Sequence, residues 1–192
     1  MILVVDFGSS KVPFISEFID EYTDVKIIKF NELGTVNPDN YLGIVFSGAP
    51  ILLSEVDPAP YLEKTMWLKQ YEKPFLGICF GHQILGLTFG ATVSRQKEDR
   101  DWQTIEILQE DPLFDKFPRE FEMMEDHCET VSIPPNFIHL GVSDACINEV
   151  MKHKEKPFYG VQFHPEVSGN LGSLLFNNFV NICERFEQEQ IK

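Results

Sequence analysis

The stretch KPFLGICFGHQILGLTFG, residues 73–90, decides the fold that this sequence predicts. Its apolar run at residues 75–78 follows a Lys-Pro pair and predicts a short buried strand. Residues 82–89 carry apolar side chains at helical spacing and end at a glycine, which predicts a helix. Between strand and helix stands GICFG, the pattern of a sharp turn that lifts a nucleophile, here Cys79, above the edge of a sheet.

A cysteine in such a turn is well placed to react. It lies at the N-terminus of a helix, where the positive end of the helix dipole stabilises the thiolate. The amide of the next residue, Phe80, would point toward a substrate carbonyl. Most free cysteines are small buried apolar residues, however, so the turn by itself leaves a purely structural role for Cys79 open.

The composition is that of a globular chain of 192 residues, a length that suits one domain spanning residues 1–192. The net charge of −14 argues against a nucleic-acid partner, since neutralising phosphates needs clustered lysine and arginine. No apolar run reaches transmembrane length, and residues 1–6 lack the basic start of a signal peptide. We therefore expect a cytoplasmic protein that does not contact a membrane.

The cysteine and histidine pattern predicts no metal site. The 4 cysteines, at positions 79, 128, 146 and 183, form no C-x-x-C pair, so we expect reduced thiols. The histidines and cysteines also lack the spacing of zinc-finger ligands. His127 and Cys128 are adjacent, and they cannot form a tetrahedral clamp without further partners.

The order of expected elements gives the fold class. Before residue 73, strands alternate with helices, which is typical of βαβ units and of a mostly parallel sheet covered by helices on both faces. After residue 90, short strands follow one another and predict antiparallel additions to an α/β fold. Strands are expected at residues 2–6, 25–30, 43–46, 75–78, 104–108, 121–124, 137–141, 147–151 and 158–163, and helices at 11–22, 60–71, 82–89 and 171–188.

Three segments should meet where ligands bind in such sheets, at the carboxyl ends of the strands. They are the Cys79 turn, the SGAP loop at residues 47–50, and GVQFHPEV at residues 160–167. In an extended segment, residues two apart point to the same side, so Glu166 can orient the ring of His164. His164 can then take the proton of Cys79. The sequence therefore predicts a Cys-His-Glu triad.

The segments LGICFGHQ and YGVQFHPEV resemble the two signatures of the class I glutamine amidotransferases, which are triad-type glutaminases. The resemblance covers nearly the whole chain and implies a flavodoxin-like fold. It implies that Cys79 attacks the side-chain amide of glutamine and forms a thioester. It further implies that His164 protonates the leaving ammonia, that Glu166 supports His164, and that the amides of Ala49 and Phe80 hold the oxyanion.

The same resemblance implies the residues that bind L-glutamine, namely Gly48, Gln83, His127 and Glu129. In this chain Ala49 stands where the family usually has a second glycine. Alanine disfavours a left-handed backbone, so we expect Ala49 to hold one oxyanion donor out of line until a partner docks.

Within the family, the second half of the chain is most similar to the separate glutaminase subunits of GMP synthase, in residues 111–121, 127–131, 143–153 and 156–167. That likeness implies an ATP-pyrophosphatase partner, which adenylylates XMP and receives the ammonia. ATP and magnesium are expected only on that partner, and no cofactor on this chain. Three alternatives stay open: a stand-alone γ-glutamyl hydrolase, a non-catalytic binding domain, and Cys128 as the nucleophile.

Overall fold

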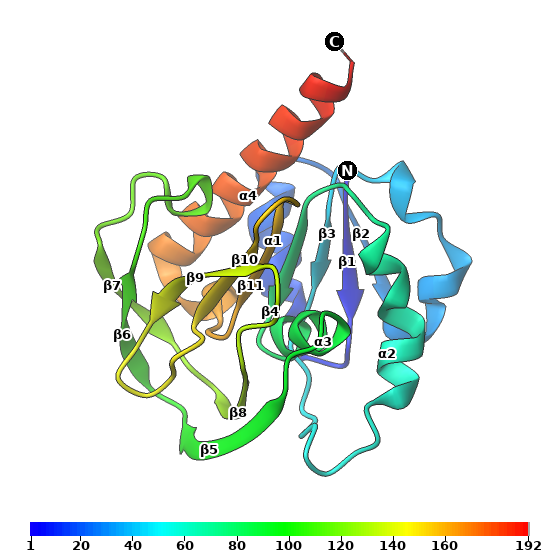
Figure 1. Ribbon diagram of the computed structural model, residues 1–192. Coiled ribbons are helices and arrows are strands. Elements are labelled where there is room, and N and C mark those ends of the chain that lie inside the picture. The colour runs from blue at the N-terminus through cyan, green and yellow to red at the C-terminus, as the bar shows by residue number, and fades with distance from the viewer. Residues whose placement is uncertain (192) are drawn as a thin grey trace.

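The computed structural model describes residues 1–191, which build one large sheet with helices on both of its faces (Figure 1). One half of the sheet pairs in parallel, in the order β2 (Val25–Lys29), β1 (Ile2–Asp6), β3 (Ile44–Phe46), β4 (Phe75–Ile78) and β11 (Phe158–Val161). The other half is antiparallel, in the order β10 (Val150–His153), β9 (Phe137–Val142), β6 (Trp102–Ile107) and β7 (Glu120–Met124). The expected α/β fold with added antiparallel strands is confirmed.

The helices divide between the two faces of the sheet, as Figure 1 shows. One face is covered by α1 (Val12–Asp20) and α4 (Gly169–Gln190), which pack against each other. The opposite face is covered by α2 (Ala59–Thr65) and α3 (Phe80–Thr88), which also pack together. This layering places the N-terminus of α3 at the carboxyl end of β4, at the edge where the predicted site should lie.

Strand β1 shows why the parallel half is so apolar. Ile2 and Val4 belong to the core beneath α1 and α4, whereas Leu3 and Val5 belong to the core beneath α3. All four side chains are fully buried. A strand that is covered on both faces needs a continuous apolar run rather than alternation, and this is the signal that located it in the sequence.

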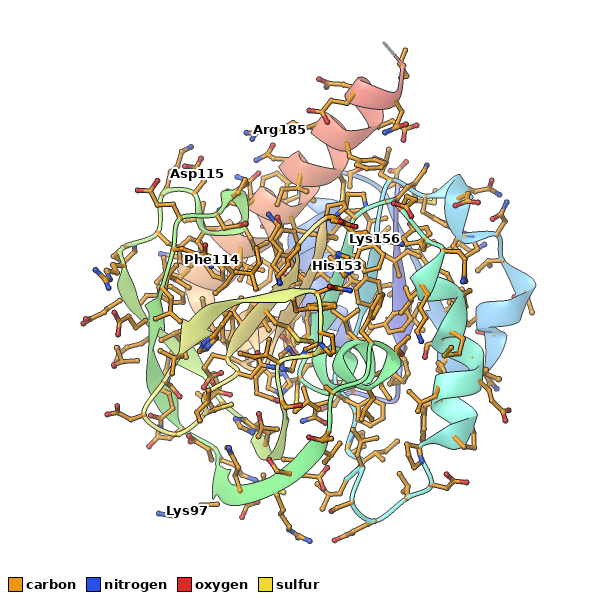
Figure 2. The ribbon with its side chains drawn as sticks, in the orientation of Figure 1. Lys97, Phe114, Asp115, His153, Lys156 and Arg185 are labelled. Atoms are coloured by element: carbon orange, nitrogen blue, oxygen red, sulfur yellow. The ribbon has the colours of Figure 1, made fainter. Side chains whose placement is uncertain are left out.

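A second, two-stranded sheet was not predicted. It pairs β5 (Val93–Asp99) antiparallel with β8 (His127–Val131), and β8 packs against α3 (Figure 1). Strand β5 has the sequence VSRQKED and no buried residue, so it lacks the apolar alternation that marks a strand. Its Lys97 projects away from the molecule, as Figure 2 shows.

Some boundaries differ from the expected ones. The helix expected at residues 60–71 ends at Thr65 and continues as a 3₁₀ turn, η3 (Met66–Lys69). Strand β10 begins at Val150 instead of residue 147, because Ile147 is 69% exposed in the preceding loop. Further 3₁₀ turns are η1 (Phe30–Thr35), η2 (Pro38–Asn40), η4 (Pro112–Phe114) and η5 (Pro165–Val167). Across residues 1–191, the helices are all too short or too polar to cross a membrane.

Candidate active site

The turn between β4 and α3 is as sharp as GICFG predicts. Cys79 stands between the two elements with φ 50° and ψ −104°, a backbone conformation that non-glycine residues rarely adopt. Backbone atoms lie so close to the two glycines beside this turn that neither position has room for a side chain. A Cβ on Gly77 would lie 2.5 Å from the carbonyl oxygen of Gly81, and one on Gly81 would lie 2.5 Å from that of Phe46. The strained position therefore belongs to the candidate nucleophile.

His164 and Glu166 form a buried pair at the end of the segment that follows β11. Their Nδ1 and Oε1 atoms lie 2.7 Å apart, and the residues are only 3% and 2% exposed. The expected extended conformation is not found, because Glu166 lies in the 3₁₀ turn η5. That turn still brings the carboxylate to the ring. It is held by Ser168, whose hydroxyl donates to the carbonyl of His164 over 2.7 Å.

The ring of His164 lies beside Cys79. Burial lowers the pKa of His164, but the neighbouring Cys79 sulfur and the Glu166 carboxylate outweigh burial and hold that pKa well above its usual value. Gly48 lies against both groups, since a Cβ there would be 3.1 Å from Cε1 of His164 and 3.6 Å from Cβ of Cys79. An imidazolium next to a cysteine is the arrangement that supports a thiolate nucleophile.

The loop after β3 is fixed by Ser47. The buried Ser47 hydroxyl accepts a hydrogen bond from the amide of Phe7 at 3.0 Å and donates to the carbonyl of Gly48 at 2.8 Å. Ala49 does not have a left-handed backbone: in residues 1–191, the non-glycine residues with positive φ are Cys79, Lys116 and Asn136. Pro50 follows Ala49, and a residue before proline favours an extended backbone. The backbone of Ala49 thus avoids the left-handed region, as expected of alanine, and the idea that it holds an oxyanion donor out of line stays a prediction.

The two backbone amides expected to hold an oxyanion make no hydrogen bond within residues 1–191. Over the described residues, neither the Ala49 nor the Phe80 amide donates to a backbone or side-chain acceptor. Phe80 is the first residue of α3, and the first amides of a helix have no partner within it. The geometry thus leaves both donors beside Cys79 free, and their role as an oxyanion hole remains a prediction.

A pocket of about 590 Å³ opens onto this site. Its wall is made by residues 49–52, by Cys79 and Phe80 at the turn, by Gln83, by side chains of β5 and by residues 126–129. Gln83, which we expected to bind glutamine, lines the pocket. Its side-chain amide donates to the carbonyl of Glu129 at 2.9 Å and to Oε1 of Gln162 at 3.2 Å.

Two other predicted substrate residues line the pocket, and their side chains are engaged with other groups of the protein. The carboxylate of Glu129 accepts hydrogen bonds from the amides of Leu53 and Ser54, at 2.6 and 2.9 Å, and so ties the 49–54 segment to β8. The ring of His127 faces the carbonyl of Glu129 through Nδ1 and the carboxylate of Glu125 through Nε2. Contact of either side chain with glutamine remains a prediction, and the structure shows both residues as part of the pocket wall.

Asp126 is a site residue that the sequence did not reveal. Its carbonyl lies 3.9 Å from the sulfur of Cys79, and its carboxylate pairs with Lys11 at 2.6 Å and Arg100 at 3.4 Å. Partial burial raises the pKa of Asp126, but the hydrogen bond and charge of Lys11 outweigh it and lower that pKa. Lys11 lies 115 positions away in the sequence, so no local signal connects the two residues.

Cys128 lines the same pocket but lacks the features of Cys79. It lies within strand β8, away from any helix N-terminus. Desolvation, together with the charge of Glu129, raises the pKa of its thiol even though Arg95 opposes the change. A raised pKa disfavours the thiolate, so the geometry favours Cys79 as the nucleophile.

Comparison with known proteins identifies the family of the chain. Residues 3–182 match the family Glutamine amidotransferase class-I. The chain is 37% identical to a glutamine-hydrolyzing GMP synthase subunit of Pyrococcus abyssi, covering 95% of this chain and 98% of that one. The protein of the same name from Pyrococcus furiosus is also 37% identical, with the same coverage.

A solved structure has the same fold along the whole of this chain. The crystal structure of a Thermoplasma acidophilum protein, provisionally named as a GMP synthase subunit, superposes with a TM-score of 0.90 at 28% identity, covering 100% of this chain and 97% of that one. A glutamine amidotransferase of Thermotoga maritima has a TM-score of 0.72 at 22% identity, covering 100% of this chain and 85% of that one, which supports the fold alone. By its sequence match and its relatives, this chain belongs to the class I glutamine amidotransferase family.

Proposed function

We propose that this chain hydrolyses the side-chain amide of L-glutamine and supplies the ammonia to a synthetase subunit that converts XMP to GMP. The observation that carries the proposal is the position of Cys79, strained at a helix N-terminus beside the His164–Glu166 pair. The relatives that align over almost the whole chain, named as glutamine-hydrolyzing GMP synthase subunits, support the choice of acceptor.

The proposed reaction begins with attack of the Cys79 sulfur on the amide carbon of glutamine. The negative charge that develops on the amide oxygen would be held by the amides of Ala49 and Phe80. His164 then gives its proton to the leaving nitrogen, which departs as ammonia and leaves a thioester. In the second half, His164 takes a proton from water, the water oxygen attacks the thioester, and glutamate and the free thiol are released. Glu166 keeps the ring oriented throughout.

The charges around the pocket suit an amino-acid substrate. Arg95 and Arg100 line it together with Glu98 and Asp126, so both signs are present within one cavity. Several of these groups are already paired, Arg100 with Glu98 at 2.6 Å and with Asp126 at 3.4 Å. A zwitterion such as the α-amino-acid end of glutamine can exchange partners with such pairs at little electrostatic cost.

The proposal assigns ATP and magnesium to the partner, an ATP-pyrophosphatase, and no cofactor of the reaction to this chain. It places both proteins in the cytoplasm, where XMP and ATP are available. The relatives are themselves named as subunits, which supports the existence of a second subunit.

The test is a reconstitution with the purified synthetase from the same organism. Ammonia, glutamate and GMP are measured with glutamine, XMP and Mg-ATP, with and without the synthetase, and with Cys79→Ala as the control. We expect glutamine-dependent GMP only when both proteins are present, and none with Cys79→Ala. Partner-independent cleavage of γ-glutamyl compounds at the full rate would instead favour a stand-alone γ-glutamyl hydrolase. Glutamine-dependent GMP from Cys79→Ala would favour a non-catalytic role for this chain.

A further inference from the structure

A cluster of buried ionisable side chains lies in and behind the wall of the pocket and takes no part in the proposed reaction. It consists of Glu125, between β7 and β8; His127, the first residue of β8; and Glu149, just before β10. These residues are 1%, 8% and 0% exposed. One ligand atom from each lies within 4.8 Å of the others. We call this set the Glu-His-Glu cluster.

The hydrogen bonding of His127 fixes which of its nitrogens is free. Nδ1 lies 3.0 Å from the carbonyl oxygen of Glu129, which can only accept, so Nδ1 carries the proton. In the neutral ring, Nε2 then has a lone pair, and it lies 3.1 Å from Oε2 of Glu125. Histidines that bind metals usually donate their other ring N–H to a carbonyl or carboxylate in this way.

The facing oxygens also lack partners. Among residues 1–191, Nε2 of His127, both carboxylate oxygens of Glu125 and Oε2 of Glu149 make no hydrogen bond. The other oxygen of Glu149 accepts the hydroxyl of Ser143 at 2.6 Å. In the same part of the chain, neither glutamate pairs with a lysine or arginine, since the one ion pair of Glu125 is with His127. Buried carboxylates are normally paired or bound to a metal.

We propose that Glu125, His127 and Glu149 bind a zinc ion, or a divalent transition-metal ion that prefers the same ligands and the same coordination geometry. One imidazole nitrogen and two carboxylates form a ligand set that Zn²⁺ accepts in tetrahedral coordination, with the fourth position open to water or a second carboxylate oxygen. The spacing of cysteine and histidine in the sequence gave no sign of this site. The glutamates come from separate parts of the chain and meet only in the folded structure.

The ion would be structural. It would join the β7–β8 connection to the start of β10, and thereby fix the strand that carries both His127 and Glu129. Because Glu129 holds the amides of Leu53 and Ser54, the metal would indirectly steady the pocket wall. This role is independent of the proposed amidotransferase reaction, and either can fail without the other.

The test is metal binding by the full-length chain in a Cys79→Ala background, which prevents zinc from binding between Cys79 and His164. The chelator-treated protein is titrated with Zn²⁺ by calorimetry and with Co²⁺ by visible absorption, and its thermal midpoint is measured with and without metal. We expect one ion per chain, a higher midpoint with zinc, and a four-coordinate Co²⁺ spectrum without a thiolate charge-transfer band. Glu125→Gln and Glu149→Gln should each weaken binding by more than about 10-fold.

The matched control is Glu122→Gln, which removes an exposed carboxylate from β7 and should bind zinc like the parent. Circular dichroism of the metal-free variants separates lost binding from lost folding, because the glutamine variants should fold without metal as well as the parent does. Equal zinc affinity in the parent and Glu149→Gln would overturn the proposal, as would a thiolate band. Absence of binding by the folded parent would also overturn it and leave a proton shared by two carboxyl groups as the explanation of the cluster.

Discussion

Nδ1 of His164 lies 2.7 Å from Oε1 of Glu166, although a 3₁₀ turn begins between the two residues. The contact depends on α4, because Gly172 of that helix lies against the carbonyl of Pro165 and leaves no room for a side chain. The position of Glu166 is thus set by a helix packed against the turn that carries it. This support explains how a short irregular segment can hold a buried ion pair in one geometry.

The pair predicts a change in pH dependence for Glu166→Gln. Cys79 and Glu166 raise the pKa of His164, so removing the Glu166 charge lowers that pKa. The imidazolium is then lost at a lower pH, and the alkaline limb of kcat/KM should move toward lower pH. Ammonia release should fall, yet remain above that of His164→Ala, because Glu166 orients the ring and does not transfer the proton. A pH profile of glutamate release checks this, and an unmoved alkaline limb would contradict it.

The raised pKa of His164 also makes the stability of the fold depend on pH. A histidine whose pKa is raised in the folded state stabilises the fold fully below its unfolded pKa, about 6.5, and this stabilisation is lost as pH rises through the folded pKa. The difference in unfolding free energy between the wild type and His164→Ala should therefore shrink as pH rises above neutrality. Urea unfolding at several pH values measures this free-energy difference. A difference that grows as pH rises would contradict the prediction.

Gly48→Ala should separate activity from stability. The added methyl would lie 3.1 Å from Cε1 of His164 and push that ring away from Cys79. A displacement of about 1 Å at a catalytic group can cost on the order of 100-fold in rate, so we expect a large loss of turnover with a normal thermal midpoint. Gly34→Ala is the matched control, because nothing lies within 4 Å of a Cβ at that position. Equal turnover in the two variants would contradict the prediction.

Glu129→Gln should loosen the pocket loop. The carboxylate of Glu129 accepts hydrogen bonds from two backbone amides, and a neutral amide can replace only one of those acceptors well. We expect a loss of about 1–3 kcal/mol in the free energy of unfolding and faster hydrogen exchange at Leu53 and Ser54. Glu55→Gln, on an exposed residue that pairs only with Arg95 among residues 1–191, is the control. Unchanged exchange at both amides would show that Glu129 does not hold the loop.

Ala49→Gly should raise the basal rate of glutamine hydrolysis. Ala49 is not left-handed in this structure, and glycine removes the penalty on a left-handed backbone there, at a cost in stability of about 0.4–1 kcal/mol. The comparison is ammonia release by both proteins without a partner. An unchanged basal rate would contradict the idea that Ala49 holds an oxyanion donor out of line.

The sequence alone located the parts of the site whose determinants are local. The turn at Cys79 is encoded within residues 73–90, where a buried strand, two glycines and a helix follow one another. The His164–Glu166 pair was found because both residues belong to one short segment. The parallel strands were found because burial on both faces makes them continuously apolar.

The features that the sequence did not reveal depend on contacts between distant segments. Strand β5 is exposed and polar, so nothing in its own residues marks it as a strand. The pair of Lys11 with Asp126 joins residues 115 positions apart. The orientation of the His127 ring depends on Glu125 and on the carbonyl of Glu129. The spacing of residues in the sequence does not predict such contacts.

Covalent labelling determines whether Cys79 is the nucleophile that attacks glutamine. The chain is treated with a glutamine-mimicking diazoketone, digested, and mapped by mass spectrometry across its 4 cysteines. We expect an adduct on Cys79 alone, with loss of labelling in His164→Ala. An adduct on Cys128, with Cys79 unmodified, would show that Cys79 is not the nucleophile.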